Sequence, residues 1–260
     1  MVGVKLNFQW KKLRLNSDFS LPKLIGHRGV KDLKPENTYE SILAAFDLGL
    51  ECVEIDVKIS KDHIPLLLHD DNLDRTTDGS GLVCDYTFDE INKLDAGYYF
   101  YKSKTKIRVP SLSSILDLVK KKQKYLNIEL KPNKNFEELN VKQVLQEIKK
   151  ISYDKIYFSS FDLSSCVSLK ESAPDLLCGF LNHDFNKINV TETIDICKKY
   201  DFFSCGINLN YFSESIVYKF FENQIQVTVY ADKNISAAQA QNLWNNKVTS
   251  VFVDDPSEYF

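Results

Sequence analysis

The chain has 260 residues, of which 43% are hydrophobic and 12% aromatic, so it can bury a sizeable core. Its length suits one large α/β domain, because α/β barrels commonly run to about 250 residues. The formal net charge of −3 argues against a general nucleic-acid-binding protein. An anionic substrate would therefore be held by a local group of cations or by a metal ion.

No segment of the sequence is typical of a signal peptide or a membrane span. Residues 1–20 are lysine-rich without an uninterrupted apolar run, and no stretch approaches the ~18 apolar residues of a span. The 6 cysteines form no Cys-x-x-Cys pair, which favours reduced, buried thiols. We therefore expect a cytoplasmic protein without stable membrane insertion. Residues 1–22 are interpreted as an N-terminal extension, and the oligomeric state is left open.

The first predicted elements are a short strand and a helix. Residues 23–26 form the strand, which ends at His27. Asn37 is predicted to be the N-cap of the helix, with Glu40 three positions on completing a capping box. Gly49 is expected to end this helix.

A hairpin is predicted next. Residues 52–59 alternate apolar and polar side chains as a strand does, and a second short strand begins at Ile64 after a tight turn. Such a turn joins only antiparallel neighbours, because parallel strands need a long crossover. The register in which Ile59 opposes Ile64 then places His69 opposite Glu54.

The remaining sequence predicts an insertion followed by a regular repeat of helices and strands. Residues 71–108 are polar and rich in turn residues, apart from an aromatic run at residues 98–101, and are interpreted as an insertion. Later elements are expected in this order: helix 113–122, strand 126–130, helix 135–150, strand 155–159, helix 163–172, strand 176–181, helix 190–200, strand 202–207, helix 213–223, strand 226–230, helix 237–245 and strand 248–253. Without the hairpin strand, eight helix-separated strands predict an α/β fold, a (β/α)₈ TIM barrel forming one domain over residues 1–260.

Three carboxylates are expected to face the inside of this barrel. Helices cover the outer faces of parallel strands, so the polar positions Glu54, Asp56, Glu129 and Lys131 must point inward, near the C-terminal mouth. Three carboxylates close together repel one another unless a cation intervenes, and oxygen ligands favour Mg²⁺ or Ca²⁺. In the alternative interpretation each charge lies on a solvated strand face of an antiparallel sheet, which the βα repeat disfavours.

Acid-base and phosphate-binding groups are expected at the same mouth. His27 and His69 both end strands, and a histidine pair beside carboxylates suits general acid and base roles. Arg28 and Lys131 suit a phosphate, the first through forked hydrogen bonds and the second as a point charge. Glu36 has two possible roles. It orients Arg28 or His27, or its negative charge stabilises the N-terminus of the following helix.

These residues form an ordered set of motifs that resembles a known family. The similarity extends from about Leu24 to Pro256 and is to the glycerophosphodiester phosphodiesterase family, most closely its bacterial cytosolic type. The motifs that carry it are His27-Arg28-Gly29, Pro35-Glu36-Asn37-Thr38, Glu54-x-Asp56, His69-Asp70, Arg75-Thr76-Thr77, Leu94-Asp95-Ala96-Gly97, Ile128-Glu129-Leu130-Lys131, Ser159-Ser160-Phe161 and Asp254-Asp255-Pro256.

The resemblance implies a (β/α)₈ barrel with a small insertion and a small-molecule glycerophosphodiester as substrate. It implies metal-dependent hydrolysis to sn-glycerol 3-phosphate and an alcohol, by a route that can pass through a cyclic phosphate. The roles that it implies by position are metal ligation by Glu54, Asp56 and Glu129, acid-base catalysis by His27 and His69, phosphate contact by Arg28 and Lys131, and support by Glu36, Asn37 and Tyr230.

The chain departs from the family pattern at two places. The family commonly has an aromatic-Thr-Val-Asn run on its seventh strand, where this chain has Tyr230 followed by Ala231 and Asp232. Tyr230 keeps the aromatic ring, although such a ring also serves core packing, and the next two residues leave the contacts to glycerol open. His63 stands in the hairpin turn where the family often has glycine.

Two alternative functions are considered. A related phospholipase would cut intact lipids, but no exposed amphipathic helix or basic membrane face supports it, and residues 98–101 are the only candidate lipid contact. A non-catalytic phosphate-binding barrel would be expected to lack a histidine or a carboxylate of the set, and all are present.

Overall fold

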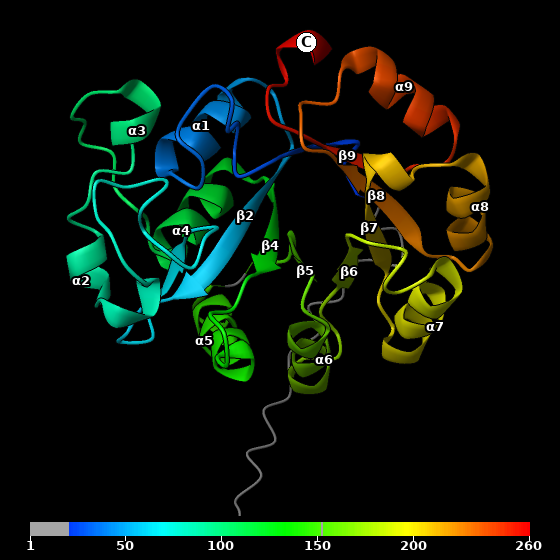
Figure 1. The fold of residues 1–260 in the computed structure, drawn as a ribbon, viewed down its shortest axis with the longest axis horizontal. Helices are drawn as coiled ribbons and strands as arrows, with labels where there is room; N and C mark the ends of the chain where they lie inside the picture. Colours follow the sequence, from blue (N-terminus) through cyan, green and yellow to red (C-terminus); the bar gives the residue numbers. More distant parts are fainter. Residues whose placement is uncertain (1–20, 152) are drawn as a thin grey trace, which may run out of the picture.

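The computed structural model describes residues 21–151 and 153–260. In this part of the chain eight parallel strands close into a barrel in the order β1-β9-β8-β7-β6-β5-β4-β2, with β3 antiparallel to β2 (Figure 1). The strands are β1 (Leu24–Gly26), β2 (Cys52–Ile59), β3 (Pro65–Leu67), β4 (Tyr125–Leu130), β5 (Ile156–Ser160), β6 (Cys178–Asn182), β7 (Ser204–Asn208), β8 (Gln226–Tyr230) and β9 (Ser250–Val253).

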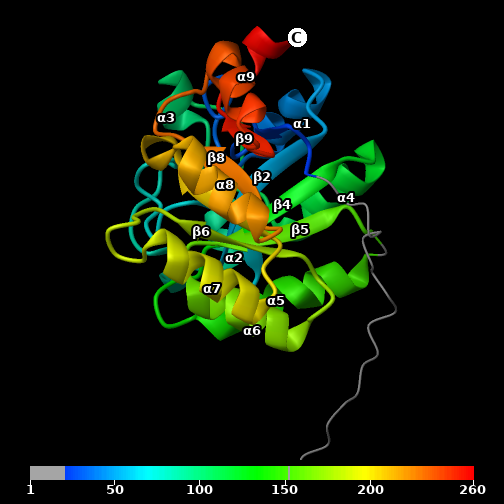
Figure 2. The ribbon, with the colours of Figure 1, turned by 90° about the vertical axis from the view of Figure 1, so that its right-hand side faces the viewer.

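Helices follow the strands around the outside of the barrel (Figures 1 and 2). The α-helices are α1 (Tyr39–Asp47), α2 (Phe88–Ile91), α3 (Tyr98–Tyr101), α4 (Leu112–Lys122), α5 (Glu137–Lys150), α6 (Leu163–Ser172), α7 (Val190–Tyr200), α8 (Glu214–Glu222) and α9 (Ala237–Asn245). Short 3₁₀ turns are η1 (Val83–Asp85), η2 (Leu209–Tyr211) and η3 (Ser257–Tyr259). The predicted (β/α)₈ fold is confirmed. Residues 1–20 of the predicted extension over residues 1–22 lie outside the described residues, and the single-domain assignment over the whole chain stays a prediction.

The barrel closes where its first strand meets its last. Gly26 of β1 pairs with Val53 of β2 on one side and with Val253 of β9 on the other. Residues that follow these three strands therefore emerge at one mouth, because all three run in the same direction.

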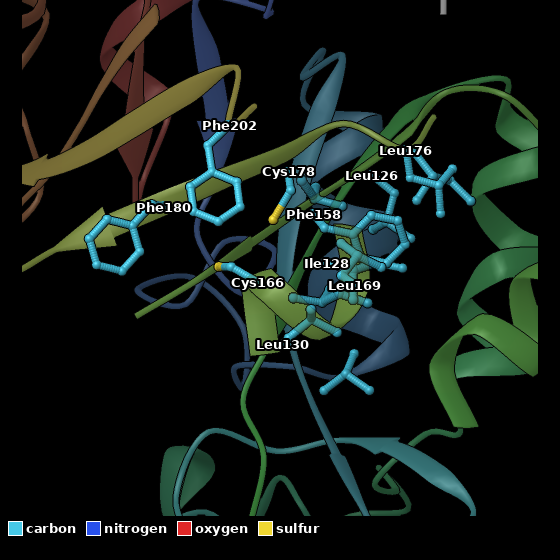
Figure 3. Close-up of a cluster of buried hydrophobic side chains, with 14 of the residues drawn as sticks. Leu126, Ile128, Leu130, Phe158, Cys166, Leu169, Leu176, Cys178, Phe180 and Phe202 are labelled. Atoms are coloured by element: carbon cyan, nitrogen blue, oxygen red, sulfur yellow. The ribbon is translucent and has the colours of Figure 1, made fainter. Parts of the chain in front are cut away.

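The apolar side chains of the strands pack outward beneath the helices, as their alternation predicts. Leu126, Ile128 and Leu130 of β4 belong to the main buried cluster, part of which Figure 3 shows together with Cys166 and Leu169 of α6. A smaller, separate buried cluster comprises Leu21, Ile25, Cys52, Tyr157 and Phe252. The 6 cysteines are free thiols, and all but Cys84 are buried.

The predicted hairpin register is wrong by one residue. Ile59 pairs with Pro65 rather than with Ile64, and the ladder ends at Leu67, so His69 is not paired with Glu54. The turn is a three-residue loop: the N–H of Ser60 donates to the carbonyl of Ile64 at 3.1 Å, and His63 has a positive φ of 64°. A left-handed residue at the end of such a loop is its usual geometry, and it shifts the pairing relative to a four-residue turn.

The predicted N-cap of α1 is also wrong. Thr38, not Asn37, caps the helix by accepting a hydrogen bond from the N–H of Ser41 at 3.2 Å. Both ends of the Asn37 amide are bound to Asp56 instead. An amide that is used in this way cannot also satisfy the helix N-terminus.

The segment between β3 and α4 contains η1, α2 and α3 and has a small core of its own. Its buried side chains are Leu66, Leu68, Leu73, Val83, Ile91, Ala96 and Val109. In the described part of the chain, no helix is long and apolar enough to cross a bilayer.

Candidate active site

A cavity of about 250 Å³ lies at the C-terminal mouth of the barrel. Seven of the ten residues that the sequence singles out line it: His27, Arg28, Glu54, His69, Glu129, Lys131 and Tyr230. The other three support them. Asp56 is buried beside the carboxylates, Asn37 binds Asp56, and Glu36 binds Arg28.

The three predicted metal ligands converge. Asp56 of β2 pairs directly with Glu129 of β4, and Glu54 lies two residues earlier on the same inward face. One oxygen of each carboxylate lies within 4.8 Å of the others. The Oε2 of Glu54 accepts a hydrogen bond from the backbone N–H of Arg28 at 3.1 Å, while its buried Oε1 has no hydrogen-bond partner among the described residues.

Burial and mutual repulsion raise the pKa of two of these carboxyl groups. Burial, with the charge of Asp56, raises the pKa of Glu129 to about 7 and raises the pKa of Glu54 well above its ordinary value. An orphan buried oxygen within such a group fits a hard divalent cation, because the site supplies the oxygen ligands that such an ion prefers and leaves one of them without a partner.

Asp56 has the opposite electrostatic balance. Burial opposes its ionisation, but Arg28 and Lys131 outweigh burial and hold the pKa of Asp56 below its ordinary range. Its Oδ2 accepts from Asn37 Nδ2 at 2.8 Å and lies 3.1 Å from Arg28 Nε, while its backbone N–H donates to Asn37 Oδ1 at 3.0 Å. Asn37 thus fixes the orientation of this carboxylate.

A tight turn after β1 aims Arg28 into the site. Arg28 has φ 53° and Gly29 has φ 87°. A Cβ at Gly29 would lie 2.4 Å from the hydroxyl oxygen of Ser41, so only glycine fits there. The turn directs the Arg28 guanidinium to Glu36, at 2.8 Å, and to Asp56.

His27 is oriented by an aspartate from the far end of the chain. Its Nδ1 lies 2.7 Å from Oδ1 of Asp254, which follows β9. A carboxylate only accepts hydrogen bonds, so Nδ1 carries the proton and Nε2 is left free in the neutral ring. Burial lowers the pKa of His27 despite Asp254, and the neutral form is therefore favoured.

His69 has a second, similar arrangement. Its Nδ1 lies 2.6 Å from Oδ1 of Asp70, and burial lowers the pKa of His69 as well. Arg75 holds Asp70 through Nε at 2.6 Å and Nη2 at 3.0 Å. The same guanidinium donates to both oxygens of Glu36, at 2.7 Å and 2.8 Å. We call these four hydrogen bonds the Arg75 clamp.

Sequence reasoning missed four residues of this site: Asp254, Asp70, Arg75 and Lys31. The Nζ of Lys31 lies 3.0 Å from Oδ2 of Asp254 and supports it. Asp70, Arg75 and Asp254 all stand in the motifs that carry the family resemblance, but their sequence positions alone assign them no role. Barrel closure was the available signal for Asp254, since it places the residues after the first and last strands side by side.

A second cavity of about 610 Å³ adjoins the first. His69 and Lys131 border both cavities. Ionic side chains line the second one, including Lys58, whose buried Nζ lies 2.7 Å from Asp71 Oδ1. A molecule made of two parts could therefore place one part in each cavity, with the junction of the parts near His69 and Lys131.

Aromatic side chains also line the first cavity. Tyr230 contacts Phe161 edge-on with ring centroids 5.5 Å apart, and Lys131 Nζ lies 5.7 Å from the centroid of Phe161. Ala231 and Asp232, which depart from the family pattern, line the same cavity. They are therefore placed to contact whatever occupies it.

Comparisons with known proteins agree with this geometry. A glycerophosphodiester phosphodiesterase from Bacillus altitudinis is 27% identical over 246 residues, which is 91% of this chain and 96% of that protein. Another, from Caldanaerobacter subterraneus subsp. tengcongensis, is 35% identical over 159 residues, 61% of this chain and 65% of that protein. A phosphodiesterase from Oleispira antarctica, solved in complex with the product sn-glycerol-3-phosphate, is 29% identical, with a TM-score of 0.84 over 91% of this chain and 94% of that chain.

The family model of the glycerophosphoryl diester phosphodiesterases matches residues 27–258. This match includes both histidines, the three carboxylates and the closing aspartate of the described site. The chain belongs to the glycerophosphoryl diester phosphodiesterase family.

Proposed function

We propose that this chain hydrolyses glycerophosphodiesters to sn-glycerol 3-phosphate and an alcohol, with a divalent cation and two histidines. One observation carries the proposal: two histidines, each oriented by an aspartate, line one cavity with two carboxylates of a three-carboxylate group. The product in the Oleispira antarctica structure supports the same substrate class.

Glu54, Asp56 and Glu129 would hold the cation, and the orphan Oε1 of Glu54 is the strongest support for it. Mg²⁺ or Ca²⁺ suits this all-oxygen set. When bound, such an ion polarises the phosphate and lowers the pKa of a hydroxyl group near it.

Arg28 and Lys131 would bind the phosphate. Both are held by carboxylates, Arg28 by Glu36 at 2.8 Å and Lys131 by Glu129 at 2.9 Å, so their positions are set before the substrate arrives. Fixed cations at a developing charge stabilise the transition state without reorganisation.

The two cavities suggest which histidine does what. His27 borders only the first cavity, whereas His69 borders both. With the glycerol phosphate in the first cavity and the alcohol in the second, His69 lies beside the leaving oxygen. His27 then accepts the proton of the attacking oxygen and His69 protonates the alcohol as the P–O bond breaks.

Release of glycerol 3-phosphate from glycerophosphocholine tests the function. We expect activity with Mg²⁺ or Ca²⁺, its loss with a chelator, and losses of at least about 100-fold in His27→Ala and His69→Ala, the usual contribution of a general acid or base. His63→Ala, in the exposed hairpin turn, is the matched control and should keep full activity.

The two roles are separated by the leaving group. On a glycerophosphodiester of p-nitrophenol, whose alcohol leaves without protonation, His69→Ala should recover most activity and His27→Ala should not. Metal-independent activity, or a fully active His69→Ala variant, would contradict the site. Activity on long-chain lipids alone would favour the phospholipase alternative.

A further inference from the structure

The segment between β3 and α4 displays aromatic side chains that its own core does not use. We call residues 97–106 the aromatic loop. None of the four aromatic residues of α3 is buried, and Tyr99, Phe100 and Tyr101 are 53%, 40% and 41% exposed. The rings contact one another, with centroids of Phe100 and Tyr101 5.0 Å apart. Exposed rings in a group mark a surface that binds something.

Hydrogen bonds join the two ends of the aromatic loop, residues 95–97 and 105–107, which we call its neck. These bonds hold the exposed rings in place. The buried carboxylate of Asp95 accepts from the N–H of Gly97 at 2.9 Å and from both the N–H and the hydroxyl of Thr105. The N–H of Ala96 donates to the carbonyl of Ile107 at 3.0 Å. A Cβ at Gly97 would lie 2.6 Å from the Thr105 hydroxyl, which shows how closely the two sides of the neck approach.

The aromatic loop is positively charged in a chain whose formal net charge is −3. Lys102, Lys104 and Lys106 are exposed, and Arg108 follows them. Over residues 21–151 and 153–260, none of the three lysines takes part in an ion pair. The one acidic residue between positions 92 and 108 is Asp95, whose carboxylate is occupied at the neck.

The aromatic loop also borders the candidate active site. Tyr99 and Phe100 line a cavity of about 210 Å³ together with Arg75 and Glu36. In Figure 1, α3 lies at the left beside α1, and α8 lies at the right. A surface bound by the aromatic loop would therefore lie beside the mouth of the barrel.

We propose that the aromatic loop binds the surface of an anionic lipid bilayer, without spanning it. Aromatic rings settle at the level of the lipid headgroups, and lysines beside them are attracted to anionic lipids. A second copy of the chain is a poorer occupant, because a two-fold contact through this patch would place lysines against lysines. The proposal concerns attachment and does not depend on the proposed function.

Sedimentation of the full chain with lipid vesicles tests the proposal. We expect binding to vesicles of equal parts phosphatidylcholine and phosphatidylglycerol, and much weaker binding to phosphatidylcholine alone or in 500 mM NaCl. Lys102→Gln/Lys104→Gln/Lys106→Gln should lower the partition coefficient at least about tenfold, since each lysine near an anionic surface contributes severalfold. Tyr99→Ser/Phe100→Ser/Tyr101→Ser should abolish the remaining binding.

The matched control is the exposed aromatic pair on α8. Tyr218 and Phe221 are 54% and 52% exposed, so Tyr218→Ser/Phe221→Ser removes a similar apolar area and should leave binding unchanged. Circular dichroism verifies that each variant is folded. The proposal is overturned if the wild type does not bind anionic vesicles or if binding persists in the Tyr99→Ser/Phe100→Ser/Tyr101→Ser variant. It is also overturned if the α8 control loses as much binding as that variant. A dimer in light scattering that the Ser variant dissociates would likewise overturn it, in favour of self-association.

Discussion

The two histidines share a design that is set by their carboxylate partners. Asp254 and Asp70 each bind Nδ1 of a histidine, which leaves Nε2 of both rings free. The pKa of each histidine lies below its ordinary value because of burial, so both are proton acceptors before substrate arrives. An anionic phosphate beside Arg28 and Lys131 would offset the positive charges that lower the pKa of His69. Binding of substrate would thus favour the protonated, acid form of His69.

The Arg75 clamp supplies the first prediction. Arg75→Ala removes all four hydrogen bonds that hold Asp70 and Glu36, so His69 and Arg28 lose their supports together. We expect kcat to fall by about 10- to 100-fold, the usual cost of losing a group that orients a catalytic or ligating residue. Because Arg75 keeps the pKa of Asp70 low, the variant should also shift the acidic limb of the pH–kcat profile.

Two control variants separate the positioning role of Arg75 from the simple loss of its charge. Arg75→Lys keeps the charge but not the planar fork, and should recover only part of the activity. Arg108→Ala removes an exposed arginine of the same segment, which donates to the carbonyl of Leu94, and this variant should stay fully active. An Arg75→Ala enzyme with unchanged kcat and pH profile would refute the positioning role.

At the scale of elements, closure of the barrel assembles half of the proposed acid-base machinery. The β1–β9 pairing brings His27 next to Asp254, 227 positions away in sequence. Asp254→Asn keeps the shape of this side chain but lets the amide donate to Nδ1, which favours the wrong tautomer of His27.

We therefore expect Asp254→Asn to lower kcat at least about tenfold while the protein stays folded. The neighbouring Asp255→Asn is the control, since the side chain of Asp255 accepts from the N–H and the hydroxyl of Ser257. Steady-state kinetics on glycerophosphocholine give the comparison. Equal losses in both variants would argue for a general structural role of this segment.

The strands and their inward carboxylates could be predicted because they follow from a periodicity of two along each strand. Glu54, Asp56 and Glu129 alternate with buried apolar residues, and a barrel leaves such polar residues only the inside. The hairpin register could not be predicted, because it depends on whether His63 adopts a left-handed backbone. The contact of Asn37 with Asp56 could not be predicted either: an asparagine at this position suits a helix cap, and only the fold brings Asp56 within its reach.

At the scale of the whole molecule, the buried carboxylates of the candidate site lower the free energy of unfolding of the metal-free protein. Glu129 is buried with a pKa of about 7, against an ordinary value of 4.5, so the folded protein binds this proton more tightly than the unfolded chain does. The free energy of unfolding of the metal-free protein therefore loses this contribution as pH rises from about 4.5 to about 7.

Glu129→Gln removes the titrating group and tests this balance. Without metal, we expect the stability of the variant relative to wild type to increase between pH 5 and pH 8, by up to about 3 kcal/mol at 1.36 kcal/mol per pH unit. Urea denaturation at both pH values measures it. Saturating Mg²⁺ should stabilise the wild type by about 2.7 kcal/mol at 100 times its dissociation constant and the variant much less. A stability difference that does not vary with pH would contradict the raised pKa.

The seam between β1 and β9 also sets when this protein can become active during its synthesis. His27 leaves the ribosome well before its partner Asp254, which follows it by 227 positions. A nascent chain that stops short of β9 has an open sheet and a histidine without its carboxylate. Catalysis by the proposed site must therefore wait until β9 and Asp254 have been translated, and we expect a product that is truncated before β9 to be inactive.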